Sequence, residues 1–296
     1  MKPPAFDYLL PDSLQEALSI LAEHGEDAKV IAGGQSLIPL LNLRMARPSV
    51  LVDINRLADL GGISRTQGQL YIGALARQAW LERSPVVAAG WPLLPAAISW
   101  VAHPQIRTRG TVGGSAVHAD AAAELPAVLT TLDAEFVVQS TSGERRVPAA
   151  EFFLGQYETA LQPHELLTEI VVPPMAERTG TGFSEYARRH GDFALAGAAA
   201  VVQLDETGRC TRARLTLLGV GQTPARLHEV EDELTGTYRH QGAEAALPKQ
   251  VLETSVRALA IGEDFHADRA HREEVAAHVA IQALTYAFDD AGRRLP

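Results

Sequence analysis

Residues 28–45, AKVIAGGQSLIPLLNLRM, join a short β-branched run to two adjacent glycines and then to an apolar, helix-like segment. Residues without a Cβ allow positive φ and let the backbone approach a ligand closely. Successive N–H groups in such a loop form a concave site for an anion. The stretch therefore predicts a strand, a loop that can hold phosphate, and a helix, although a lone glycine pair is more often only a tight turn.

A second pair, Gly113-Gly114, lies in TRGTVGGSAVHAD, residues 108–120, and is expected to form a turn before a helix at 122–132. Ser36 and Ser115 follow the two pairs and could donate hydrogen bonds to phosphate oxygens. Two such sites favour one pyrophosphate ligand over two unrelated turns. The stretch GVGQTP lacks the third glycine of a dinucleotide fingerprint, and no Walker A sequence occurs, so neither a Rossmann fold nor a nucleoside triphosphatase is indicated.

The pattern of apolar residues predicts three parts. Ser13 and Glu16 fit a capping box at the start of a helix, and a second strand at 49–54 completes a small α/β unit at 1–55. A hairpin turning near Gln67-Gly68 opens a second part, 56–175. The polar, glycine-rich stretch 174–182 predicts a boundary, and 176–296 reads as a three-stranded sheet covered by helices.

The composition narrows the possible partners and compartment. The formal net charge is −10, with 36 acidic and 26 basic residues, which disfavours nucleic acid and anionic membrane surfaces. A single cysteine, Cys210, excludes a disulfide framework within the chain and any four-cysteine iron–sulfur or zinc site. With neither a signal peptide nor a transmembrane segment in the sequence, a cytoplasmic protein is expected.

Three separated stretches resemble a known family in both order and spacing. They are KVIAGGQSLIPLLNLRMARPSVLVDINRL, HPQIRTRGTVGGSAVHADAAAELP and RRHGDFALAGAAAVV. The chain resembles, over nearly its whole length, the FAD-binding medium subunit of molybdenum hydroxylases, the group that includes carbon monoxide dehydrogenase and xanthine dehydrogenase. The resemblance implies an α+β fold: a two-subdomain FAD-binding domain of the vanillyl-alcohol-oxidase (PCMH) type, then a C-terminal domain with a three-stranded antiparallel sheet and helices.

The resemblance also implies which residues hold FAD. Both glycine segments would hold its diphosphate, Asp120 and Glu124 its ribose hydroxyls, and Phe193 would lie over the isoalloxazine ring. The full implied set is Val30, Ile31, Ala32, Gly33, Gly34, Gln35, Ser36, Leu37, Val101, Ile106, Thr111, Val112, Gly113, Gly114, Ser115, Asp120, Glu124, Leu167 and Phe193. From the residues alone, either carboxylate could instead cap the following helix, and Phe193 could be plain core in an alanine-rich strand.

The implied function needs no catalytic side chain and no metal ligand in this chain, because the flavin carries the redox chemistry. A large subunit would hold a molybdenum cofactor and a small subunit two 2Fe–2S clusters, together forming a dimer of heterotrimers. The chain would pass electrons to an external acceptor: NAD, oxygen, a quinone or a carrier protein. The substrate stays open between carbon monoxide and an aromatic N-heterocycle, because Gln35 and Phe193 stand where the carbon monoxide branch has histidine and tyrosine. Two alternatives are a non-catalytic nucleotide-binding scaffold and a stand-alone flavin reductase.

Overall fold

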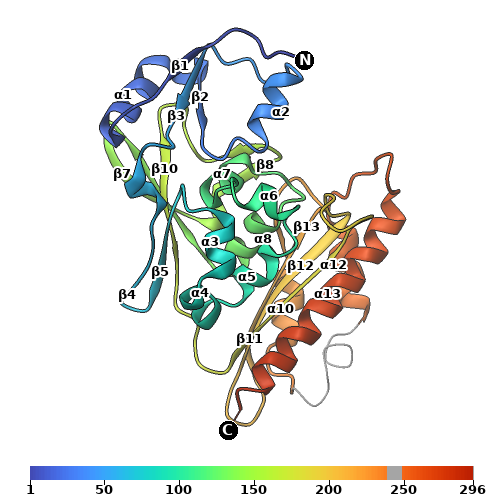
Figure 1. The fold of residues 1–296 in the computed structure, drawn as a ribbon. Helices are drawn as coiled ribbons and strands as arrows, with labels where there is room; N and C mark the ends of the chain where they lie inside the picture. The colour runs from blue at the N-terminus through green and yellow to red at the C-terminus, as the bar shows by residue number, and fades with distance from the viewer. Residues whose placement is uncertain (239–248, 296) are drawn as a thin grey trace.

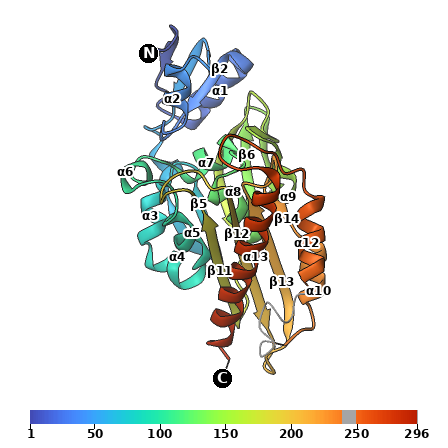
Figure 2. The same cartoon turned by 90° about the vertical axis from the view of Figure 1, so that its right-hand side faces the viewer.

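The computed structural model describes residues 1–238 and 249–295. Its N-terminal unit is a parallel three-stranded sheet with strand order β1-β3-β2 and two helices beside it (Figure 1). The elements are β1 (Asp7–Leu9), α1 (Leu14–His24), β2 (Ala28–Ile31), α2 (Leu37–Asn42) and β3 (Val50–Asp53). This unit lies at one end of the molecule (Figures 1 and 2).

Helix α1 begins and ends as its sequence predicts. The Ser13 hydroxyl accepts a hydrogen bond from the Glu16 N–H, and the Glu16 carboxylate accepts one from the Asp12 N–H at 2.8 Å. Gly25 ends the helix at φ 52°. The buried face of α1 covers the sheet, so the predicted helix and the two following strands are confirmed.

The second unit is an antiparallel five-stranded sheet with strand order β4-β5-β10-β6-β7. Short helices cover it on the side that faces the C-terminal sheet (Figure 1). Its strands are β4 (Ile63–Thr66), β5 (Gln69–Gly73), β6 (Glu135–Ser140), β7 (Gly143–Pro148) and β10 (Leu166–Val172), and the small ribbon beside them is β8 (Phe153–Gly155) and β9 (Glu158–Thr159). Its helices are α3 (Gln78–Arg83), α4 (Pro85–Gly90), α5 (Leu93–Ile98), α6 (Pro104–Arg107), α7 (Val112–His118), α8 (Glu124–Thr131) and α9 (Ala149–Phe152). The predicted hairpin turn is confirmed, with positive φ at Gln67 and Gly68.

The second glycine pair lies in a helix, which corrects the expected turn. Gly113 and Gly114 belong to the first turn of α7, and neither has positive φ. The helix starts here because the Thr111 hydroxyl caps it, accepting a hydrogen bond from the Gly114 N–H at 3.0 Å. The expected helix at 122–132 is α8, which begins only at Glu124.

The C-terminal sheet has four strands in the order β11-β12-β13-β14, one more than expected. They are β11 (Thr179–Tyr186), β12 (Ala196–Leu204), β13 (Cys210–Leu218) and the two-residue β14 (Ala225–Arg226). A turn at Thr207-Gly208 joins β12 to β13, and the Asp205 carboxylate accepts the Thr207 N–H there at 2.8 Å. Helices α10 (His228–Leu234), α12 (Lys249–Ala258) and α13 (Arg269–Gly292) pack on this sheet, and α13 runs along it (Figures 1 and 2).

The stretch predicted as a domain boundary, 174–182, is partly a strand, because β11 begins at Thr179. Its glycines are not loop residues. A Cβ on Gly182 would overlap the Ala283 carbonyl oxygen of α13, and one on Gly180 would lie 2.8 Å from the Ala291 Cα. The glycines are therefore needed for close packing between the strand and the helix. In a polar stretch such glycines are more typical of a loop, so the sequence did not indicate this role.

The architecture is α+β, as expected. One large core joins the five-stranded sheet, its helices and one face of the C-terminal sheet, and a second core lies between that sheet and its helices. Within the described residues, no helix has both the length and the apolar character required to cross a membrane.

Candidate functional site

The first site segment is the loop of residues 32–36 between β2 and α2. Val30 and Ile31 are the last residues of β2, and Leu37 is the first of α2. The backbone N–H groups of residues 33–36 have no hydrogen-bond acceptor within the described parts of the chain, and the Ser36 side chain is exposed. Successive unpaired N–H groups need an acceptor, and an anion supplies one to several of them at once.

Gly33 brings this loop against the second segment. A Cβ on Gly33 would overlap the Arg109 carbonyl oxygen and lie 2.9 Å from the Gly110 Cα. A Cβ on Gly114 would lie 4.0 Å from the Ala32 Cβ, so the two segments meet at a second point. Only Gly34, at φ 72°, uses the conformational freedom of glycine. The expected convergence of the two segments is therefore present in the fold.

Two side chains, Asn55 and Arg77, link the two segments through hydrogen bonds. Sequence reasoning missed both residues. The Asn55 amide donates to the Ala32 carbonyl at 2.7 Å and accepts from Arg77 at 2.8 Å. Arg77 also donates to the Arg109 carbonyl at 2.5 Å. Burial, followed by the nearby Arg109 guanidinium, lowers the pKa of Arg77. Asn55 lies two residues beyond the end of β3, the strand that pairs with β2, but its position in the sequence does not indicate that it contacts Arg77.

The backbone N–H groups of residues 112–115 in the second segment are already paired within the protein, contrary to expectation. The Gly113 N–H donates to the Ala74 carbonyl at 3.0 Å, and the N–H groups of Gly114 and Ser115 donate to Thr111 at 3.0 and 3.1 Å. A Cβ on Gly113 would lie 2.7 Å from Ala74 atoms. This segment is thus held rigidly against β5, and it offers a ligand side chains, the Ser115 hydroxyl among them, more than backbone donors.

Gln35 has a local structural role. Its side-chain amide donates to the Gly33 carbonyl at 2.9 Å, across the turn that contains the unpaired N–H groups. This hydrogen bond holds the Gly33 carbonyl oxygen within the turn. An amide at this position therefore shapes the loop by itself, without a change of charge near neutral pH.

The apolar residues of the implied set do not all lie at one surface. Val101 and Ile106 flank the loop before and within α6 and are half-buried. Between them, Ala102 has a φ of 41°. Leu167 of β10 is buried in the main core opposite Val138 of β6. Val101 and Ile106 are accessible for contact with a ligand, whereas the Leu167 side chain is part of the core.

Asp120 caps the turn before α8. Its carboxylate accepts the Ala122 N–H at 2.9 Å and the Tyr157 hydroxyl at 3.4 Å. Tyr157 has a φ of 62°, its N–H donates to the Ala119 carbonyl at 2.9 Å, and Ala119 has a φ of 49°. Two non-glycine residues in this conformation are strained, which is common at binding sites. The Tyr157 ring also lies 5.0 Å from that of His118. Sequence reasoning missed both aromatic residues.

Glu124 at the start of α8 and Glu185 near the end of β11 are two carboxyl groups with raised pKa values. Burial raises the pKa of Glu124 to about 7, and the nearby Asp120 adds to the rise. Burial raises the pKa of Glu185 to about 8, and Glu124 adds to it. Glu185 is 9% exposed, and one of its carboxyl oxygens has no partner among the described residues. Sequence reasoning missed Glu185, because only the fold brings β11 to the start of α8.

The raised pKa values of Glu124 and Glu185 predict that the free energy of unfolding falls as pH rises. Both folded-state pKa values lie above the ordinary 4.5, so the stability from the protonated groups is fully present below that pH and is lost as pH rises through about 7 to 8. Glu185→Gln removes one ionisable group, so the midpoint of thermal unfolding should depend less on pH between about pH 5 and 9. The largest increase over wild type is expected at the alkaline end of this range. Thermal unfolding measured across this range checks it. Glu23→Gln, at an exposed carboxylate of α1, is the control and should leave the slope unchanged. An equal slope in wild type and Glu185→Gln would contradict the raised pKa of Glu185.

Phe193 lies in the loop between β11 and β12 and is 75% exposed. The alternative that it is plain core is therefore wrong. The loop is held from its two sides, since the Leu195 carbonyl accepts from the Arg272 guanidinium at 2.9 Å and Arg188 contacts the His266 ring nitrogen at 2.9 Å. A large aromatic side chain exposed on an anchored loop is available to cover a planar ligand.

These features fit a flavin dinucleotide. The loop at 33–36 supplies several unpaired N–H groups for a diphosphate, and Gly33 gives it a close backbone contact on one side. Hydroxyl, carboxyl and aromatic groups from α7, α8 and the 187–195 loop supply the polar and stacking contacts that ribose and a ring system require. The chemistry of the donor set therefore matches FAD.

The chain matches two family models in sequence. Residues 4–175 match the FAD binding domain in molybdopterin dehydrogenase, and residues 181–287 match the carbon monoxide dehydrogenase flavoprotein C-terminal domain. The chain is 52% identical over 234 residues, 79% of each chain, to the 6-hydroxypseudooxynicotine dehydrogenase complex subunit alpha of Paenarthrobacter nicotinovorans. It is 42% identical to the caffeine dehydrogenase subunit beta of a Pseudomonas species, covering 98% of this chain and 97% of that one.

The fold also matches a solved structure. A chain of carbon monoxide dehydrogenase from Hydrogenophaga pseudoflava superposes with a TM-score of 0.91 at 36% identity, covering 98% of this chain and 99% of that one. The α+β arrangement of an FAD-binding domain followed by a domain of antiparallel sheet and helices is shared. The chain therefore belongs to the family of FAD-binding medium subunits of molybdenum hydroxylases and is a subunit of a flavin-dependent oxidoreductase.

Proposed function

We propose that this chain is the electron-output subunit of a three-part complex. Electrons from substrate oxidation at a molybdenum cofactor in a large subunit pass through two 2Fe–2S clusters of a small subunit and leave through this chain to an external acceptor. A dimer of heterotrimers in the cytoplasm is the proposed assembly. The single cysteine, Cys210, is buried, which is consistent with clusters held by a partner.

The observation that carries the proposal is the run of unpaired N–H groups at residues 33–36, closed on one side by Arg109 and Gly110. These groups would hold the diphosphate of FAD, together with the Ser36 and Ser115 hydroxyls. Bound FAD supplies the redox chemistry, and the protein binds and orients it. Glu124 would face the ribose, Val101 and Ile106 would line the pocket, and Phe193 would exclude water from the ring.

Most remaining members of the implied set hold the site segments in place. Val30, Ile31 and Leu37 fix the ends of the first segment, and Gln35 fixes its turn. Thr111 and Val112 start the helix that holds the second segment. The Asp120 carboxylate already accepts two hydrogen bonds within the protein, so we assign it to shaping the loop before α8 and leave ribose contact to Glu124.

We further propose that the complex oxidises a nitrogen-containing organic ring compound and not carbon monoxide. Support comes from identities of 52% and 42% to subunits named for 6-hydroxypseudooxynicotine and caffeine, against 36% to the carbon monoxide dehydrogenase chain. Gln35 and Phe193, which replace the histidine and tyrosine of the carbon monoxide branch, support the same assignment. The division into 1–55, 56–175 and 176–296 is proposed as well, since the strands of each main sheet fall within one of these ranges.

One experiment separates this function from a scaffold or a stand-alone flavin reductase. The purified complex should contain FAD in a one-to-one ratio with this chain, and nicotine or caffeine derivatives should bleach the flavin absorbance, which an added acceptor restores. A scaffold would carry no reducible flavin. A stand-alone reductase would show the same cycle with this chain alone. Stoichiometric chain without flavin would refute the proposed function.

A further inference from the structure

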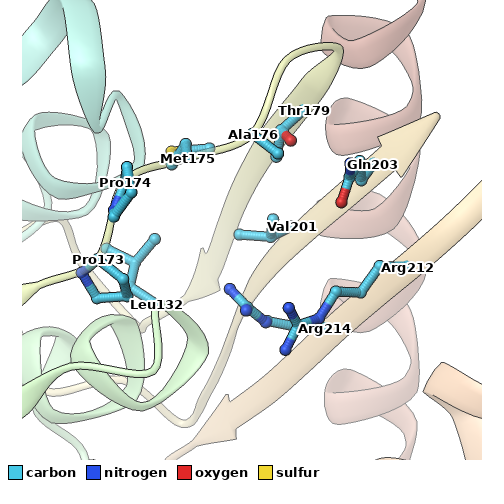
Figure 3. Close-up of a pocket in the computed structure, with 10 residues that line it drawn as sticks. All are labelled: Leu132, Pro173, Pro174, Met175, Ala176, Thr179, Val201, Gln203, Arg212 and Arg214. Atoms are coloured by element: carbon cyan, nitrogen blue, oxygen red, sulfur yellow. The ribbon is translucent and has the colours of Figure 1, made fainter. Parts of the chain in front are cut away.

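A cavity of about 70 Å³ lies between the second unit and the C-terminal sheet, away from the proposed cofactor site (Figure 3). Apolar residues of the segment 173–176 and Leu132 form one wall. The other wall comes from three neighbouring strands and is mostly polar, with Thr179 on β11, Val201 and Gln203 on β12, and Arg212 and Arg214 on β13 (Figure 3). We call it the Arg214 cavity.

Two polar atoms in this wall are buried without a partner. The Thr179 hydroxyl oxygen and the Arg214 Nε have no hydrogen-bond partner among the described residues, and Thr179 is only 4% exposed. Burying such groups without a hydrogen-bond partner costs free energy, so a partner within the cavity is expected. Both groups are donors, and a ligand with acceptor atoms would satisfy them.

The charges around the cavity favour a negative ligand. Arg212, Arg214 and Arg226 all contact one carboxylate, that of Asp133, at 3.3, 2.5 and 2.5 Å. Arg226 additionally pairs with Glu231 at 2.7 Å, which leaves three guanidinium groups against two carboxylates. Burial, partly offset by Asp133, lowers the pKa of Arg214, and the neighbouring arginines lower it further. An added anion would relieve this crowding of positive charge.

The size of the cavity limits the ligand to a few atoms. One water molecule needs roughly 10–15 Å³ of such space, so the cavity holds about five waters or one small oxyanion. We propose that the Arg214 cavity binds a small oxyanion, a phosphate or a carboxylate, through the Thr179 hydroxyl, the Arg214 Nε and the Arg212 guanidinium.

Calorimetric titration of the purified complex tests this with inorganic phosphate and with acetate, against sodium chloride at matched ionic strength. Phosphate or acetate should bind at one site per copy of this chain, and the tighter of the two identifies the source. Thr179→Val should weaken binding about tenfold, since it removes one hydrogen bond to a charged group. Because the hydroxyl has no partner within the described protein, this change should leave folding intact.

Two further variants keep the test decisive. Arg212→Gln alters a side chain that is 58% exposed and should also weaken binding about tenfold. Thr66→Val, at an exposed threonine on β4, is the matched control and should bind as wild type does. No heat from either anion beyond that of chloride would overturn the proposal. Equal affinity in wild type and either cavity variant would do the same.

Discussion

Gly182→Val is expected to prevent accumulation of folded protein, or to lower the free energy of unfolding by more than about 3 kcal/mol. The reason is backbone contact. A Cβ at this position would overlap the Ala283 carbonyl oxygen and lie 2.9 Å from the Ala287 N atom, and neither atom can move unless α13 shifts. The helix would have to separate from β11, which would expose the core between them.

Chemical denaturation of the purified variant, with soluble yield as a second readout, measures the effect. Gly262→Val is the matched control, because nothing lies within 4 Å of a Cβ there and the residue belongs to the same C-terminal part. An unfolding midpoint for Gly182→Val equal to that of wild type would show that α13 does not pack on this strand through its backbone.

Gly33→Val is expected to weaken FAD binding about tenfold to a hundredfold while the rest of the fold is retained. The added side chain must push the first segment away from Arg109 and Gly110, and such overpacking costs about 1–3 kcal/mol. Moving the two segments apart also weakens the hydrogen bonds that Asn55 and Arg77 make between them, so the N–H groups at 33–36 lose their fixed geometry. The ratio of flavin to protein absorbance in the purified complex measures the loss.

Gly62→Val is the control for this effect, since its φ is −70° and a Cβ there meets open space. It should keep its full flavin content. Circular dichroism should be the same for both variants and wild type, which separates loss of cofactor from unfolding. Full FAD occupancy in Gly33→Val would assign the glycine pair to a turn only and remove the first segment from the cofactor site.

Features that depend on nearby residues were predictable from the sequence. The Ser13 and Glu16 cap of α1, the turn at Gln67-Gly68 and the turn at Thr207-Gly208 each use contacts within a few residues. The succession of strands and helices follows from such contacts and from apolar periodicity. For the same reason the three family motifs could be located, since each is a continuous segment.

Features that depend on distant segments were not predictable from the residues alone. Whether a backbone N–H is free depends on which segment lies beside it, so the sequence could not distinguish the open loop at 33–36 from Gly113, whose N–H donates to Ala74. Glu185 lies 61 positions from Glu124, and Thr179 lies 35 positions from Arg214. No helical or strand periodicity in the sequence relates residues at these separations.

The sequence by itself thus determined the order of elements and the positions of the two glycine segments, because local sterics and hydrogen bonding fix these. Its three continuous motifs also indicated the family. Tertiary structure decided that Gly182 is a packing residue, that Phe193 is exposed, and that the N–H groups of Gly113 and Gly114 are paired within the protein whereas those of residues 33–36 are not. The physical reason is that burial, close backbone contact and the availability of a donor are properties of two surfaces in contact. Local sequence specifies the side chains on each surface. Which two surfaces come into contact is decided only when the whole chain folds.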